Sequence, residues 1–116
     1  MSRIEVHRGD VFYADLGYDG TSRQGGIRPI VIVSNPYCNQ YSSIISVVSL
    51  STARTKAWIP THVKIKADES GLEKDSICLC EQPMSIAKTA LRRFVVHLDE
   101  THMDKIDAGL RCQLCL

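Results

Sequence analysis

The sequence predicts a small, mainly β protein with one C-terminal helix, folded as a small barrel or a curled sheet. Short β-branched and aromatic runs recur along the chain between turn residues, which is typical of many short strands. The clear helical pattern comes last, with apolar residues at spacings of three, four and four: Met103, Ile106, Leu110 and Leu114. A length of 116 residues, 44% hydrophobic and 23% charged, fits a single domain over residues 1–116.

Five to seven strands are expected, and six segments carry the signal: 11–16, 30–33, 44–50, 61–66, 76–81 and 94–98. The segment 44–50 has β-branched residues on both faces and is expected inside the sheet. The segment 61–66 alternates, so Val63 and Ile65 should point inward while His62 points to water.

Turn and cap residues separate these elements. Ser34-Asn35-Pro36 and residues 68–71 read as turns. Ser85 can cap a short helical turn that runs through Thr89-Ala90, and Asp99 can cap the closing helix.

The net charge of +1 is unevenly distributed. Residues 1–66 carry eight Lys or Arg against four Asp or Glu, and residues 67–116 carry six against nine. A local basic patch in the first half can hold a polyanion, but the chain lacks the strongly basic coat of an indiscriminate nucleic-acid binder. The N-terminus has no signal-peptide pattern and no stretch is long and apolar enough to span a bilayer, so a cytoplasmic protein without membrane contact is expected.

Five cysteines, without a secretion signal, argue against a disulfide framework. Cys78, Cys80, Cys112 and Cys115 can supply four thiolates to zinc. The one-residue spacing of the first pair is unusual for such a site, so buried reduced thiols acting as small hydrophobic side chains are expected instead. We therefore expect no metal and no cofactor.

The most informative stretch is Arg23-Gln24-Gly25-Gly26-Ile27-Arg28-Pro29-Ile30. The paired glycines permit unusual backbone conformations and close approach of another molecule. Pro29 favours an extended conformation for Arg28 at the start of a buried strand. An arginine fixed in this way can bind a phosphate through its planar set of donors. On these residues alone, an ordinary glycine turn with a solvated arginine is an equally good interpretation.

The chain resembles the MazF/PemK family in residues 9–16, 24–29, 60–63, 81–82 and 97–99, in the family's order. The resemblance runs from about residue 8 to about residue 107, and its most specific part is the block Gln24-Gly25-Gly26-Ile27-Arg28-Pro29. It implies an SH3-like, partly open β-barrel with a C-terminal helix, the CcdB/PemK-like toxin fold, in a homodimer.

The resemblance further implies a ribonuclease toxin of a type II toxin–antitoxin pair. Such a protein cleaves single-stranded RNA (mRNA) at short sequences, without a metal, leaving a 2′,3′-cyclic phosphate and a 5′-hydroxyl. An antitoxin with a disordered acidic tail blocks the site. The family's catalytic arginine falls on Arg28, and its usual threonine falls on Ser51, with Thr52 as the neighbouring alternative.

RNA contacts are expected from other residues of the loop and from strand ends. Gln24 and Gln82 are candidates for the sugar–phosphate chain or base edges, and Tyr18 for stacking on a splayed base. The remaining candidates are Arg23, Gly25 and Gly26 in the loop and Thr52 just past the end of the segment 44–50.

The expected chemistry follows from the substrate, because cleavage through a cyclic phosphate uses the 2′-hydroxyl of the RNA as nucleophile. The protein must then orient the phosphate and stabilise its charge. Arg28 is always protonated and suits charge stabilisation better than the role of a base. The four histidines are expected to be surface or packing residues. Two alternatives stay open: a non-enzymatic toxin that poisons DNA gyrase through its C-terminal helix, and a small barrel that only binds peptides or RNA.

Overall fold

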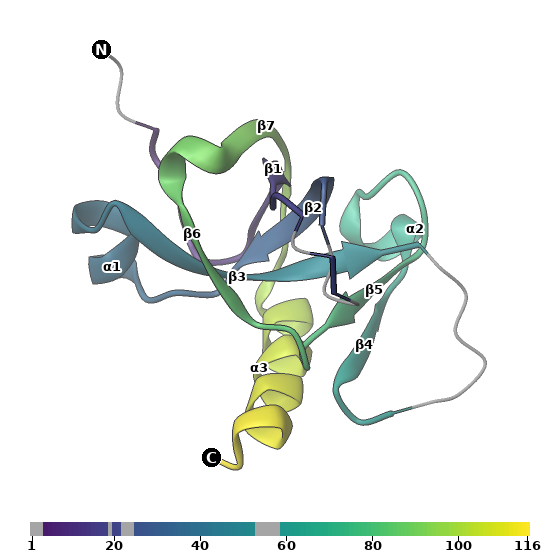
Figure 1. The fold of residues 1–116 in the computed structure, drawn as a ribbon. Coiled ribbons are helices and arrows are strands. Elements are labelled where there is room, and N and C mark those ends of the chain that lie inside the picture. The colour runs from purple at the N-terminus through teal and green to yellow at the C-terminus, as the bar shows by residue number, and fades with distance from the viewer. Residues whose placement is uncertain (1–3, 19, 22–24, 53–58) are drawn as a thin grey trace.

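The computed structural model describes residues 4–18, 20–21, 25–52 and 59–116 (Figure 1). Within these residues seven strands form one antiparallel sheet, in the order β4-β5-β3-β2-β1-β7 with β6 paired to β3. The strands are β1 Asp10–Asp15, β2 Ile27–Ile32, β3 Ile44–Ser51, β4 His62–Ile65, β5 Ser76–Leu79, β6 Met84–Ala87 and β7 Leu91–His97. The helices are α1 Pro36–Tyr41, α2 Ala67–Ser70 and α3 Glu100–Leu114, with a 3-10 turn at Lys88–Ala90.

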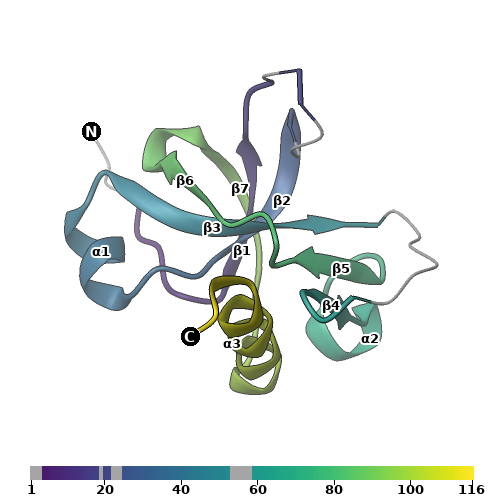
Figure 2. The ribbon, with the colours of Figure 1, turned by 60° about the horizontal axis from the view of Figure 1, so that its bottom comes forward.

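Strand β3 is the centre of the sheet because it pairs with three others. Its middle residues pair with β2, its first half with β6, and Leu50 and Ser51 with β5. The helix α1 lies near one end of β3, and α2 with β4 and β5 lies near the other (Figures 1 and 2). No pairing joins β4 to β7 among the described strands, so the sheet is curled but not a closed barrel. The expected mainly β fold with a C-terminal helix is confirmed.

Both faces of the central strands are buried, which explains their near-continuous apolar runs. Alternate residues belong to opposite faces, so Val11 and Phe12 enter different clusters. The cluster on one face contains Val11 and the α3 residues Met103 and Ile106. The cluster on the other face contains Phe12 and is flanked by Met84 and Ile86 of β6.

Two segments differ from their predicted structures. The residues expected to form a turn at 34–36 instead begin α1, because the Asn35 side chain accepts a hydrogen bond from the Cys38 amide and Pro36 stands in the first turn. Ser85 does not cap a helical turn, because Met84–Ala87 is strand β6 paired with β3. The helical turn is confined to Lys88–Ala90.

The strand and turn around residues 62–71 are largely as predicted. Val63 and Ile65 are buried, as expected. His62, predicted to point to water, is mostly buried, and its Nε2 lies 2.9 Å from the Glu81 carboxylate. The turn at 68–71 is part of α2, which ends at Gly71 in the left-handed conformation.

The closing helix begins where predicted. Asp99 caps α3 by accepting a hydrogen bond from the His102 amide, and the backbone and ring of His102 lower the pKa of the Asp99 carboxyl. Met103 and Ile106 are buried, but Leu114 at the far end is 53% exposed. The apolar stripe therefore packs against the core from Met103 to Leu110, and only the last turn of the helix extends beyond it. Within the described ranges, no helix is long and apolar enough to cross a membrane.

The cysteines behave in two ways. Cys78 and Cys80 are buried as expected, with their sulfur atoms 3.9 Å apart. The hydrogen bond with Cys80 and full burial raise the pKa of the Cys78 thiol, which keeps it neutral. The expectation of burial is wrong for Cys112 and Cys115, which are exposed because the end of α3 extends past the sheet. Across the described part of the chain, no three His, Cys, Asp or Glu side chains cluster as metal ligands.

Gly109 lies at a close contact between α3 and the β4–β5 hairpin. A Cβ atom at this position would lie 2.8 Å from the Cys80 sulfur and 3.2 Å from Val63 Cγ2. We expect Gly109→Ala to lower the free energy of unfolding by about 1–2 kcal/mol, because overpacking outweighs the gain in helix propensity. Urea denaturation measures this change.

The double variant Gly109→Ala/Cys80→Ala is the matched control. The double variant lacks the sulfur that the new Cβ would meet. Its loss in free energy of unfolding should therefore be smaller than the sum of the losses in the two single variants. Additive effects would contradict the proposed contact.

Candidate active site

A groove of about 410 Å³ brings together the start of β2, the end of β3 and the segment between α2 and β5. Arg28, Ser51 and Thr52, the predicted catalytic candidates, all line it. These residues lie far apart in the sequence. They meet because β2 and β3 are adjacent antiparallel strands, so the beginning of one lies beside the end of the other.

The guanidinium of Arg28 is held by the backbone. Its Nε donates a hydrogen bond to the Gly25 carbonyl over 3.0 Å, and Arg28 lies opposite Ala14 in the pairing of β2 with β1. Among the described residues no carboxylate pairs with Arg28. Within the described ranges its two terminal nitrogens therefore have no carboxylate partner, and the Glu73 carboxylate is the one acid among the described residues that line the same groove.

The paired glycines have separate geometric roles. A Cβ at Gly25 would lie only 2.7 Å from the Gly17 carbonyl oxygen, so the two arms of the β1–β2 connection approach too closely for any other residue. Gly26 has a φ of +72° and donates a hydrogen bond to Gly17 over 2.7 Å. The glycines thus position the carbonyl that holds Arg28.

Two hydroxyls lie at the edge of the groove. Ser51 is the last residue of β3, is half-buried and pairs with Ile77 of β5. Thr52 follows it, outside the strand and exposed. Both line the groove, so the structure brings the two alternative hydroxyls into the same site as Arg28.

Sequence reasoning missed several residues of the groove. Tyr13, Lys74 and Arg93 line it, together with the carboxylate of Glu73. The guanidinium carbon of Arg93 lies 4.9 Å from the centre of the Tyr13 ring, within the range of a cation–π interaction. The signal available in the sequence was the pair of arginines that precedes the apolar run of β7.

Other predicted RNA-binding residues lie elsewhere. Tyr18 is 83% exposed on the β1–β2 connection, and Gln82 lies in the turn after β5. Neither is among the described residues that line the groove, nor are Gly25 and Gly26. Arg23 and Gln24 lie outside the described residues, so their roles stay predictions.

The histidines have partners away from the groove, and none of them lines it. Each lies near a carboxylate: His7 and His97 near Asp10, His62 near Glu81 and His102 near Asp99. Asp10 is buried, and it also accepts a hydrogen bond from the His7 amide over 2.8 Å. These contacts fit packing and structural roles.

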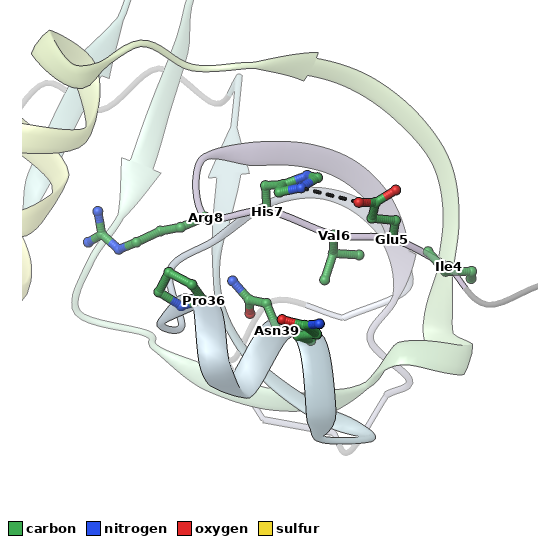
Figure 3. Close-up of a pocket in the computed structure, with 8 residues that line it drawn as sticks. Ile4, Glu5, Val6, His7, Arg8, Pro36 and Asn39 are labelled. Atoms are coloured by element: carbon green, nitrogen blue, oxygen red, sulfur yellow. Dashed lines mark ion pairs between the residues drawn. The ribbon is translucent and has the colours of Figure 1, made fainter.

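A second, larger hollow lies between the N-terminal segment and α1 (Figure 3). Its charged groups are already paired, Glu5 with His7 at 3.6 Å and Arg8 with Asp107 of α3. Asn39 points toward it in Figure 3, but its amide hydrogen-bonds to Ser34. The hollow thus offers little unpaired charge, in contrast to the groove at Arg28.

Known proteins resemble this chain over nearly its full length. Endoribonuclease EndoA of Bacillus subtilis (strain 168) is 41% identical over 111 residues, covering 96% of each chain. Endoribonuclease MazF of Staphylococcus epidermidis is 40% identical over 111 residues, covering 96% of this chain and 92% of the relative.

The fold is also similar to solved structures of endoribonucleases and MazF proteins. A mycobacterial endoribonuclease in complex with its cognate antitoxin is 28% identical, with a TM-score of 0.78 over 94% of both chains. MazF from Deinococcus radiodurans matches with a TM-score of 0.83 at 16% identity, over 98% of this chain and all of the other, and supports the fold alone. A family model described as PemK-like, MazF-like toxin of type II toxin-antitoxin system matches residues 7–114. The chain belongs to this PemK/MazF toxin family.

Proposed function

We propose that this protein is an endoribonuclease toxin that cleaves single-stranded RNA, mRNA included, at short preferred sequences. The observation that carries the proposal is the Arg28 guanidinium, held by a backbone carbonyl and without a carboxylate partner in the described structure, in a groove with two hydroxyls. The relatives named endoribonuclease support the same interpretation.

The proposed reaction needs no nucleophile from the protein. The 2′-oxygen of the RNA attacks the adjacent phosphorus and the bond from phosphorus to the 5′-oxygen breaks. The products are a 2′,3′-cyclic phosphate and a 5′-hydroxyl, and the proton lost at the 2′-oxygen is balanced by one gained at the 5′-oxygen. Terminal nitrogens of Arg28 donate to the phosphoryl oxygens as negative charge develops. Ser51 or Thr52 orients the phosphate or the 2′-hydroxyl. We propose that this chemistry proceeds without a metal ion.

The gyrase-binding alternative does not account for this groove. A non-enzymatic toxin that acts through its C-terminal helix does not require Gly25, Arg28 and the hydroxyls to converge. The third possibility, a barrel that only binds RNA or peptides, predicts salt-dependent affinity without cleavage products.

We also propose that the toxin is a homodimer neutralised by an antitoxin with a disordered acidic tail. The mycobacterial structure with its cognate antitoxin supports such a partner. The cationic side chains of the groove, Arg28, Lys74 and Arg93, are suited to an acidic segment as well as to RNA. Light scattering of the toxin alone, and with the product of a neighbouring reading frame, tests both assemblies.

The central test is cleavage of a long single-stranded RNA in excess EDTA. The wild-type protein should produce discrete fragments with 2′,3′-cyclic phosphate ends. Arg28→Ala should lose about 10³-fold or more in kcat/KM, because it removes the stabilisation of phosphoryl charge. Arg28→Lys should recover only part of the rate, since it keeps the charge without the planar donors. An unchanged thermal midpoint should show that the variants fold, and full activity of Arg28→Ala would overturn the assignment.

Separate hydroxyl deletions identify the second group. Of Ser51→Ala and Thr52→Ala, the variant that lacks the positioning hydroxyl should lose about tenfold to a thousandfold in kcat. The other variant serves as its matched control and should change little. Wild-type rates in both single variants and in the double variant would exclude a role for either hydroxyl.

Gly25→Ala tests whether the backbone carbonyl of Gly25 must hold Arg28 in place. The added Cβ, 2.7 Å from the Gly17 oxygen, should displace the carbonyl that holds the guanidinium and lower kcat by about 10²-fold. Gly20→Ala is the control, because Gly20 lies on the same connection, but a Cβ added there would meet nothing within 4 Å, so that only the strain of its positive φ of +79° is added. Equal activity of the two variants would show that the close approach at Gly25 does not matter for the site.

A further inference from the structure

The strand β7 is irregular beside the groove. Phe12 of β1 pairs with Phe94, but Ala14, two residues on, pairs with Leu91. Between these two pairs β7 advances by three residues and β1 by two, so β7 contains one extra residue, which is a β-bulge. Arg92 and Arg93 together face the single residue Tyr13.

The two arginines of this bulge have different surroundings. Arg92 lies 3.6 Å from the Asp15 carboxylate, and its NH1 donates to the Thr89 carbonyl over 3.0 Å. Arg93 instead lies over the Tyr13 ring and lines the groove. In the described part of the chain Arg93 has no carboxylate partner. The bulge thus directs one arginine to an ion pair and the other to the groove.

The contact with Tyr13 holds Arg93 without neutralising it. The aromatic ring attracts the guanidinium and restrains its position, and this contact takes up none of its N–H groups. Those N–H groups match the oxygens of a phosphate. Lys74 adds a third cation to the groove, besides Arg28 and Arg93, and Glu73 is the one carboxylate among its described lining residues.

We propose that Arg93, stacked on Tyr13 and assisted by Lys74, binds a phosphate of the RNA that flanks the cleaved linkage. This inference rests on the proposed function, because it places the substrate strand in the groove that contains Arg28. Arg93 is a positioning residue, since it contacts a part of the strand that does not react. Its contribution should therefore appear mainly in substrate affinity and KM.

The test uses the intact protein and an RNA that spans a cleavage site mapped with wild-type enzyme. A fluorescent copy with 2′-O-methyl groups throughout has no nucleophile and reports binding alone. If the wild-type protein cuts no RNA, a 2′-O-methyl pool of mixed sequence is the binding probe. Arg93→Gln should weaken binding about tenfold or more, because it removes a charge-assisted hydrogen bond to phosphate. The slope of log affinity against log salt should become shallower by about 0.7, the value for one phosphate on a single strand.

Three further variants separate the stacked arginine from general charge. Arg92→Gln is the matched control: it removes the same charge one residue away, from an ion pair, and should keep the wild-type slope. Arg93→Lys should keep the slope but bind more weakly than wild type. Tyr13→Leu should weaken binding without changing the slope. In cleavage assays, Arg93→Gln should raise KM and leave kcat nearly unchanged.

Single methylphosphonates, which remove one phosphate charge at a time, locate the contact. Wild type should lose affinity at one flanking position where Arg93→Gln loses none. Wild-type affinity and slope in Arg93→Gln would overturn the inference. So would an Arg93→Gln variant that binds an acidic peptide more weakly than wild type but binds the RNA equally well. These outcomes are independent of the proposed cleavage: a protein that binds as described but cuts no RNA would refute the ribonuclease proposal and leave the phosphate site standing.

Discussion

The hydrogen bond from Arg28 to the Gly25 carbonyl is the interaction on which the candidate site depends. A carboxylate partner would fix the guanidinium equally well but would cancel the charge that a phosphate needs. A backbone carbonyl orients the side chain and leaves its charge in place. That solution requires a backbone turn at the correct distance, which only Gly25, packed against the Gly17 carbonyl, permits. The backbone conformation at Gly25 thus allows Arg28 to be held while its positive charge is kept in the groove.

The motifs that suggest the family divide into two physical groups. Arg28 and Pro29 of the Arg28 block and Tyr13 of residues 9–16 contribute to the groove, whereas other residues of these motifs hold the sheet and helix together. Asp10 joins the first turn to β7 through His97, Asp99 caps α3, and Glu81 pairs with His62 across the β4–β5 hairpin. Three histidines, a residue type common in acid–base catalysis, are thereby engaged in structural contacts. A motif shared with a nuclease family is therefore not, by itself, a list of groups that contact RNA.

Period-two patterning and cap residues made most of the strands, and the start of α3, predictable. The failures have local causes. Asn35-Pro36 is a turn signal and a helix start at once, and only packing decides that a helix follows. Ser85 lies in a strand because β3 offers an edge to Met84–Ala87, which no local pattern reveals. In the groove, Arg28 was found from its position before Pro29 at the start of a strand, and Ser51 from the resemblance to the family. Tyr13, Lys74 and Arg93 were missed because strand pairing and loop packing, rather than sequence neighbours, bring them together.

The bulge in β7 separates two properties that evolution can change independently. Arg28 and the hydroxyls depend on β2 and β3, while the side chain presented beside them from β7 depends on a local register irregularity. A one-residue insertion or deletion there exchanges which β7 side chain faces the groove and leaves the central strands in place. On the proposed function, relatives that share Arg28 and the hydroxyls can therefore diverge in the RNA contexts that they prefer, through an edge of the sheet that takes no part in bond breaking.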